Sequence, residues 1–294
     1  MNQSKTSIVA PTISGPIANT RKPKFVMPRG ACDCHAHLFG PQTRYAYAAN
    51  RRYTPPDATA GDYIKMLRTI GVDRVVLVQP SVYMTDNTVI LDALAENDFP
   101  LRAVAVVTNA VTDAELERMH KLGVRGLRLN LRNSNGATAD IAPQLAARIA
   151  PLGWHLQYRI NPEDFVGIGP SLQKLPVDIV IDHIGQVPVA EGIHGAAFCS
   201  ILELAGSGRC WVKLSAPMRM SAEPHPYRDV TPFIKALVAA APERMLWATD
   251  WPHTTLTCAM PDDGDLADLL PEWIPDAATR QKILVDNPAR LYGF

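Results

Sequence analysis

Eight short runs of apolar, mostly β-branched residues recur along the chain, and segments with helical spacing of apolar residues separate them. Val75, Val76, Leu77 and Val78 form one such run, and residues 177–181 contain another. Strands that are buried on both faces have this composition, because helices cover both sides of a parallel sheet. The pattern predicts strands at residues 32–37, 74–79, 102–107, 126–130, 155–160, 177–182, 211–214 and 245–248.

Helical patterns lie between these runs, at residues 61–70, 87–97, 142–150, 196–205, 230–240 and 277–284, and a further helix opens at Thr112. Eight strands that alternate with helices predict an α/β fold of the TIM type, a closed (β/α)₈ barrel. A doubly wound open sheet is the alternative, but no glycine-rich phosphate turn follows the first strand. We expect one barrel domain over residues 25–294 and a flexible N-terminal arm over residues 1–24.

Charge and composition limit the classes of function. The formal net charge is zero and no basic stripe appears, so we expect no nucleic-acid partner. No apolar run reaches the roughly 18 residues that a membrane span needs, so we expect no membrane partner. The five cysteines lack the spacing of a disulfide framework and are typical of reduced thiols in a cytoplasmic enzyme. The sequence leaves open whether the chain forms a homo-oligomer.

Polar residues stand where three of the predicted strands end. His35 and His37 close the first strand, His183 follows the sixth and Asp250 follows the eighth. Residues two apart in an extended chain point to the same side, and the carboxyl ends of barrel strands converge on one site. An HxH pair alone is more often structural, but the combination predicts an active site. His155 begins the fifth strand, at the opposite end, and we expect a structural role for it.

The same four side chains can hold a metal ion. Three imidazole nitrogens and one carboxylate oxygen can bind a single zinc or similar divalent ion and leave a position for water. We see no histidine at the carboxyl end of the fifth strand and no bridging lysine to support a second ion. The alternative is a site without metal, in which the imidazoles themselves act as electrophiles.

Several ordered segments of the chain resemble a known family. They include His35-Ala36-His37 and Thr249-Asp250-Trp251-Pro252-His253, and in full they cover residues 33–41, 85–87, 124–130, 153–155, 181–185, 249–253, 261–264 and 287–292. From about residue 24 to the C-terminus the chain resembles the amidohydrolase superfamily and, within it, the 2-pyrone-4,6-dicarboxylate lactonases, with the 4-sulfomuconolactone hydrolases as close relatives.

The resemblance implies a hydrolase that opens a small anionic lactone in the degradation of aromatic compounds. It assigns Asp250 as the general base that activates water. It assigns His35, His37 and His183 to polarise the lactone carbonyl and hold the developing oxyanion.

The resemblance also implies a set of substrate contacts. Tyr53, Ser81, Arg128 and Arg219 match such positions, and we expect His253 either on the substrate side of the eighth strand or directly behind the residues that touch the substrate. An arginine fork suits a planar carboxylate or a sulfonate. For Arg128, a surface ion pair is the alternative.

The anion-binding positions depart from the family pattern. A second arginine after the fourth strand falls near Ser134, with Arg132 as its nearest replacement, and a tyrosine at the fifth strand becomes Arg159. An arginine becomes Gln186 and an asparagine becomes Thr255. These changes favour a five-membered muconolactone-type acid, including a sulfonated one, over the planar pyrone dicarboxylate. Arg159 could equally turn into the core and pair with an acid such as Glu163.

Three other functions share parts of this pattern. A decarboxylase of the same superfamily shares the HxH pair, the later histidine and the aspartate. A lactone isomerase is a second alternative, although a relative of that kind lacks the first histidine of the pair, and His35 is present here. A binding protein without catalysis is the third, but it would not need a base, oxyanion groups and an anion clamp together.

Overall fold

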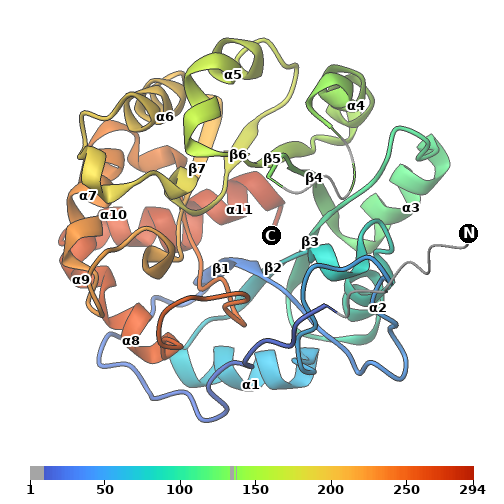
Figure 1. The fold of residues 1–294 in the computed structure, drawn as a ribbon, viewed down its shortest axis with the longest axis horizontal. Helices are drawn as coiled ribbons and strands as arrows, with labels where there is room; N and C mark the ends of the chain where they lie inside the picture. The colour runs from blue at the N-terminus through green and yellow to red at the C-terminus, as the bar shows by residue number, and fades with distance from the viewer. Residues whose placement is uncertain (1–9, 133–135, 137) are drawn as a thin grey trace, which may run out of the picture.

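A computed structural model describes residues 10–132, 136 and 138–294 of the chain. Eight parallel strands follow one another around a single sheet in sequence order, with helices outside them (Figure 1), which confirms the predicted TIM-type barrel. The strands are β1 (Cys32–Ala36), β2 (Arg74–Val78), β3 (Leu101–Ala105), β4 (Val124–Asn130), β5 (His155–Arg159), β6 (Ile179–Ile181), β7 (Cys210–Leu214) and β8 (Met245–Trp247).

The barrel closes between β1 and the segment that follows β8. Asp250 N donates to His35 O at 3.0 Å, and His37 N donates to Trp251 O at 2.8 Å. Ala36 and Trp251 form a parallel bridge. The first and last strand ends are therefore neighbours, as the barrel prediction requires.

The helices pack around the strands. They are α1 (Ala60–Ile70), α2 (Thr88–Glu96), α3 (Asp113–Leu122), α4 (Ala142–Ile149), α5 (Phe165–Leu172), α6 (Ala196–Gly206), α7 (Thr231–Ala240), α8 (Asp263–Asp268), α9 (Leu270–Trp273), α10 (Ala277–Gln281) and α11 (Asn287–Tyr292). The sequence did not predict α5, because Gly167, Gly169 and Pro170 all have low helix propensity. The helix predicted at 277–284 is α10 followed by a π-helical turn, Lys282–Asp286.

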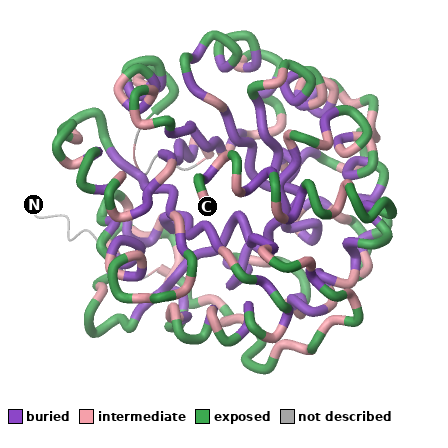
Figure 2. Tube along the Cα trace, turned by 180° about the vertical axis from the view of Figure 1, so that it is seen from behind, coloured by how far each residue is buried: buried purple, intermediate pink, exposed green. Residues whose placement is uncertain are grey.

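Two hydrophobic clusters stabilise the barrel, and Figure 2 shows the buried chain gathered at its centre. The larger one joins the outer strand residues to the helices. The smaller one takes the alternate strand residues, among them Cys34, Val78 and Trp211, and so fills the inside of the barrel. Tyr292 of α11 belongs to this inner cluster, and its carbonyl accepts a hydrogen bond from Arg102 of β3. This helix therefore covers the amino-terminal end of the barrel.

The described part of the N-terminal segment lies against the barrel. Ile13 N donates to Thr54 O at 3.1 Å, and Arg21 pairs with Asp265 and Asp268 of α8. All five cysteines are free thiols. Within the described ranges, no helix is both long and apolar enough to cross a bilayer.

Candidate active site

A cavity of about 440 Å³ opens at the carboxyl ends of the strands. Most of the residues that the sequence singled out line it: His37, Tyr53, Ser81, Arg128, Arg132, Arg159, His183, Arg219 and Asp250. His35 lies directly beneath, fully buried, and touches this group through His37. The active sites of TIM-barrel enzymes lie at this end of the barrel.

The three histidines surround one oxygen of Asp250. His35 Nε2 lies 3.3 Å from His37 Nε2. Asp250 Oδ1 lies 3.8 Å from His35 Nε2, 3.9 Å from His37 Nε2 and 3.6 Å from His183 Nε2. The structure therefore brings the predicted quartet together around a single carboxylate oxygen.

The backbone is constrained where these side chains emerge. His183 has φ of 52° and Asp250 has φ of 67°, in the left-handed region that non-glycine residues rarely adopt. Such conformations persist when surrounding contacts enforce them, and they cluster at active sites. At Asp250 one such contact is the hydrogen bond from its N–H to His35 O. Asp33, a residue that the sequence did not single out, holds the neighbouring strand ends together. Its carboxylate accepts from His35 N at 3.1 Å and from Thr249 N at 3.0 Å, which joins the ends of β1 and β8.

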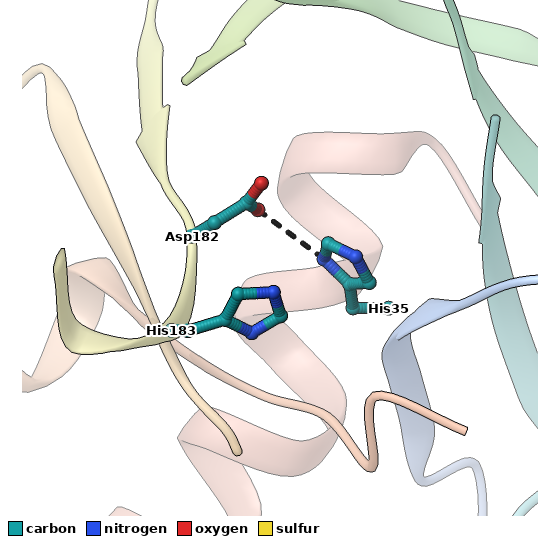
Figure 3. Close-up of side chains that lie close together, drawn as sticks. All are labelled: His35, Asp182 and His183. Carbon is teal, nitrogen blue, oxygen red and sulfur yellow. Dashed lines mark ion pairs between the residues drawn. The ribbon is translucent and has the colours of Figure 1, made fainter. Parts of the chain in front are cut away.

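Hydrogen bonds orient each imidazole. His37 Nδ1 lies 2.7 Å from the carbonyl of Val78, and because a carbonyl only accepts, Nδ1 carries the proton and Nε2 a lone pair. His183 Nδ1 lies 2.8 Å from Ser215 Oγ. His35 Nδ1 has two contacts, with Asp182 Oδ1 at 3.2 Å (Figure 3) and with Lys213 Nζ at 3.2 Å.

Burial sets the protonation of these groups. Burial, together with the charge of Arg128, lowers the pKa of His37 to about 4. Burial lowers the pKa of His183 to about 3, so both imidazoles are neutral near pH 7. Burial acts to raise the pKa of Asp250, but His183, Arg219, His35 and His37 together act to lower it, and the net pKa lies below its usual range. An ionised carboxylate among neutral imidazoles can accept a proton from water.

Two of the predicted anion-binding arginines already hold carboxylates of the protein. Arg219 Nε donates to Asp250 Oδ2 at 2.9 Å. Arg128 binds Asp182 Oδ2 through Nε at 3.0 Å and through Nη2 at 3.0 Å. Arg128 also lines the cavity, and its ion pair is buried, so it is not the surface pair that was the alternative.

Arg132 and Arg159, which differ from the pattern of the similar lactonases, line the same cavity. Arg132 donates to Asn161 Oδ1 at 3.0 Å and to Gln186 Oε1. Arg159 is mostly buried, and none of the described residues accepts a hydrogen bond from its Nε. Among the described residues, Arg159 forms no ion pair with Glu163. Its side chain lines the cavity instead. Burial and the charges of Arg128 and Arg219 lower the pKa of Arg159.

The other predicted contacts separate into two groups. Tyr53 and Ser81 line the cavity together with Thr254 and Thr255. His253 does not line it: its ring is buried, and Nε2 lies 3.0 Å from Asp263 Oδ1 at the start of α8. Ser134 lies outside the described residues.

Sequence reasoning missed the polar layer beneath the cavity. Lys213 on β7 and Gln157 on β5 are fully buried, and Lys213 Nζ donates to Gln157 Oε1 at 2.7 Å. Gln157 Nε2 in turn donates to Asp182 Oδ1 at 2.8 Å. One signal was present, because a lysine in the apolar strand Trp211-Val212-Lys213-Leu214 requires buried partners.

Metal-ligand spacing is met by part of the quartet. One ligand atom each from His35, His37 and Asp250 lies within 4.8 Å of the others, and His183 groups instead with His35 and Asp182. Tetrahedral zinc with bonds of 2.0–2.1 Å separates its ligands by roughly 3.3 Å. The separations of 3.3, 3.8 and 3.9 Å are close to this value, so the first set fits a three-ligand site with an open position.

Comparison with known proteins agrees with this geometry. Residues 32–294 match the amidohydrolase family. The chain belongs to this family. A 2-pyrone-4,6-dicarboxylate hydrolase of Comamonas testosteroni is 38% identical over 286 residues, which is 94% of each chain. A 4-sulfomuconolactone hydrolase of Rhizobium radiobacter is 37% identical over 288 residues, 96% of each chain. A crystal structure of an Agrobacterium tumefaciens protein superposes with a TM-score of 0.83 at 28% identity, over 92% of this chain and 98% of that one.

Proposed function

We propose that this member of the amidohydrolase family is a hydrolase that opens an anionic lactone. The observation that carries the proposal is the charge of the cavity. Five arginines line it: Arg52, Arg128, Arg132, Arg159 and Arg219. Asp250 is the one acid among its described lining residues. Such a cavity suits a substrate with more than one negative group. The names of the two similar hydrolases, which specify a dicarboxylate and a sulfonated lactone, support this substrate class.

Asp250 serves as the general base in this proposal. It takes a proton from water while the water oxygen bonds to the carbonyl carbon of the lactone, and the carbonyl π electrons move to oxygen. When the carbonyl re-forms, the ring C–O bond breaks and the departing oxygen takes the proton from Asp250. The product is the ring-opened acid, and the base returns to its starting state.

The histidines stabilise charge on the carbonyl oxygen and position the reacting groups. An Nε2–H on His183 can donate to the carbonyl oxygen as charge develops there. His37 differs from the expectation, because its Nδ1 donates to Val78 and a neutral ring then offers only a lone pair at Nε2. We assign it to position His35, whose Nε2 lies 3.3 Å from its own Nε2.

A divalent ion such as zinc would be held by His35, His37 and Asp250. When bound, the ion supplies Lewis acidity and lowers the pKa of water. We also propose that the enzyme works in the cytoplasm, since its five thiols are unpaired and three of them are buried.

A single assay separates lactone hydrolysis from the alternatives. Purified protein is mixed with a muconolactone or with 2-pyrone-4,6-dicarboxylate, while ring absorbance, proton release and carbon dioxide are recorded. Hydrolysis releases one proton for each lactone consumed and no carbon dioxide. Carbon dioxide would indicate the decarboxylase, and a change of absorbance without a proton would indicate the isomerase. Saturable binding without turnover would indicate a binding protein.

A further inference from the structure

His35 Nδ1 faces a donor and an acceptor at the same distance, and both cannot be satisfied by one form of the ring. Asp182 Oδ1 can only accept a proton from Nδ1, and the ammonium of Lys213 can only give one to it. If Asp182 prevails, Nδ1 carries the proton and Nε2 offers a lone pair. If Lys213 prevails, Nε2 carries the proton.

The surrounding contacts favour Lys213. Asp182 already accepts from Gln157 Nε2 at 2.8 Å and from two nitrogens of Arg128 at 3.0 Å, so its carboxylate is satisfied without His35. Lys213 has three protons in a fully buried position. Two of its contacts can only accept, Gln157 Oε1 at 2.7 Å and Asp182 Oδ1 at 3.8 Å, and the third is His35 Nδ1 at 3.2 Å. A proton on Nδ1 would set two donors against each other.

The rest of the chain of contacts agrees with this choice. His37 keeps its proton on Nδ1 for the Val78 carbonyl, so its Nε2 needs a donor. His35 Nε2 lies 3.3 Å away and supplies that donor only when it carries the proton. Each hydrogen bond then runs in one direction, from Lys213 through His35 and His37 to Val78.

We propose that Lys213 is a positioning residue that holds the proton of His35 on Nε2 and thereby disfavours metal binding at the HxH pair. A metal ion needs the Nε2 lone pair, and such ligands usually donate from the other ring nitrogen to a carboxylate. Asp182 is placed for that second role but is opposed by Lys213. The inference rests on the proposed function only in assuming that this site is the reactive one.

Nuclear magnetic resonance tests the tautomer without any substrate. Protein labelled with ¹⁵N at histidine is treated with a chelator, and long-range ¹H–¹⁵N correlations show which ring nitrogens are protonated. The His35 signals are identified by their loss in His35→Gln. We expect the proton of His35 on Nε2 in the unmodified protein. A proton on Nδ1 would overturn the proposal.

Lys213→Met removes the ammonium and keeps much of the volume, so the His35 proton should move to Nδ1 and face Asp182. Zinc affinity, measured by competition with a coloured chelator, should then rise by about 10–100-fold, the size of effect that outer partners of metal ligands have. Ser215→Ala is the matched control, because Ser215 follows the end of the strand that carries Lys213 and is the partner of His183, so its loss should leave the His35 tautomer unchanged. An unaltered tautomer and zinc affinity in Lys213→Met would contradict the proposal. If that variant does not fold, the tautomer of His35 in the unmodified protein is the test of the proposal. Lactone turnover enters neither readout, so a failure of the proposed function would show separately in the lactone assay.

Discussion

Arg219 Nε donates to Asp250 Oδ2 at 2.9 Å, while Asp250 Oδ1 faces the three imidazoles. The two oxygens of one carboxylate therefore have different environments. Arg219 also donates to the carbonyl of Thr254 at 2.8 Å, which fixes the guanidinium in place. The arginine that we expected to meet a substrate carboxylate thus also orients the base.

Asp250→Asn keeps the shape of the side chain but cannot accept a proton. We expect kcat to fall by about 10²–10⁴-fold, the usual contribution of one proton-transfer group, with little change in stability. The rate is measured in preparations with matched metal content. Asp178→Asn, at the opposite end of the barrel, is the control and should keep its activity. An Asp250→Asn enzyme that retains most of its kcat would exclude this residue as the base.

Arg219→Met should move the pH profile. Arg219 helps to hold the pKa of Asp250 below its usual range, so the base is already ionised well below neutral pH. Without the guanidinium that pKa rises, and Asp250 becomes protonated at a higher pH than before. We therefore expect the acid limb of kcat/KM to shift upward in pH. If the limb stays in place while only KM increases, Arg219 acts on the substrate alone.

Arg128→Met should destabilise the fold as well as weaken binding. It would leave the buried Asp182 carboxylate without its bidentate partner, and breaking such a pair typically costs about 3–5 kcal/mol of unfolding free energy. Arg118→Met removes an exposed ion pair with Glu115 and should change stability by less than about 1 kcal/mol. Urea unfolding of both variants checks the contrast. Equal effects would show that the Arg128 pair contributes no more than a surface pair.

Buried neutral histidines should make stability depend on pH. Burial lowers the pKa of His155 to about 3, and the same effect acts on His37 and His183, so these rings stay neutral in the folded state below pH 6.5. In the unfolded chain they take up protons as pH falls through 6.5. The unfolded state then binds more protons, so stability decreases between pH 6.5 and about 4, by up to about 1.4 kcal/mol per pH unit for each ring.

Urea unfolding at neutral pH and at about pH 5 measures this decrease. His155→Phe keeps an aromatic ring against Tyr292. It should reduce the change of unfolding free energy with pH by the contribution of one histidine. Substitution of the exposed His194 by glutamine provides the comparison. Stability that is flat over this range would mean that the folded protein binds these protons too.

The sequence predicted those features of the site that follow from the order and direction of the strands. Once eight strands alternate with helices, the ends of β1, β6 and β8 must meet, and the four site residues on them meet as a consequence. It could not predict contacts that depend on side-chain rotamers across the barrel. Lys213 reaches His35 over 178 positions of sequence, and no local pattern encodes that pair. His253 shows the same limit, since its position beyond β8 did not reveal that its ring turns toward Asp263.

The last prediction concerns which lactone the enzyme prefers. Arg159 lines the cavity on β5, at a position where the resemblance to the pyrone lactonases leads us to expect a tyrosine, and no described residue accepts a hydrogen bond from its Nε. Arg132 is held by Asn161 and Gln186 on the same side. A guanidinium fixes the direction as well as the charge of its partner, so a second anionic group of the substrate should lie toward β5. We therefore expect a higher kcat/KM for a muconolactone-type acid, including the sulfonated one, than for the planar pyrone dicarboxylate. Arg159→Tyr should shift this ratio toward the pyrone, with Arg118→Tyr on the exposed face of α3, outside the cavity, as a matched control. If the unmodified enzyme prefers the pyrone and Arg159→Tyr leaves the ratio unchanged, these arginines do not set the specificity.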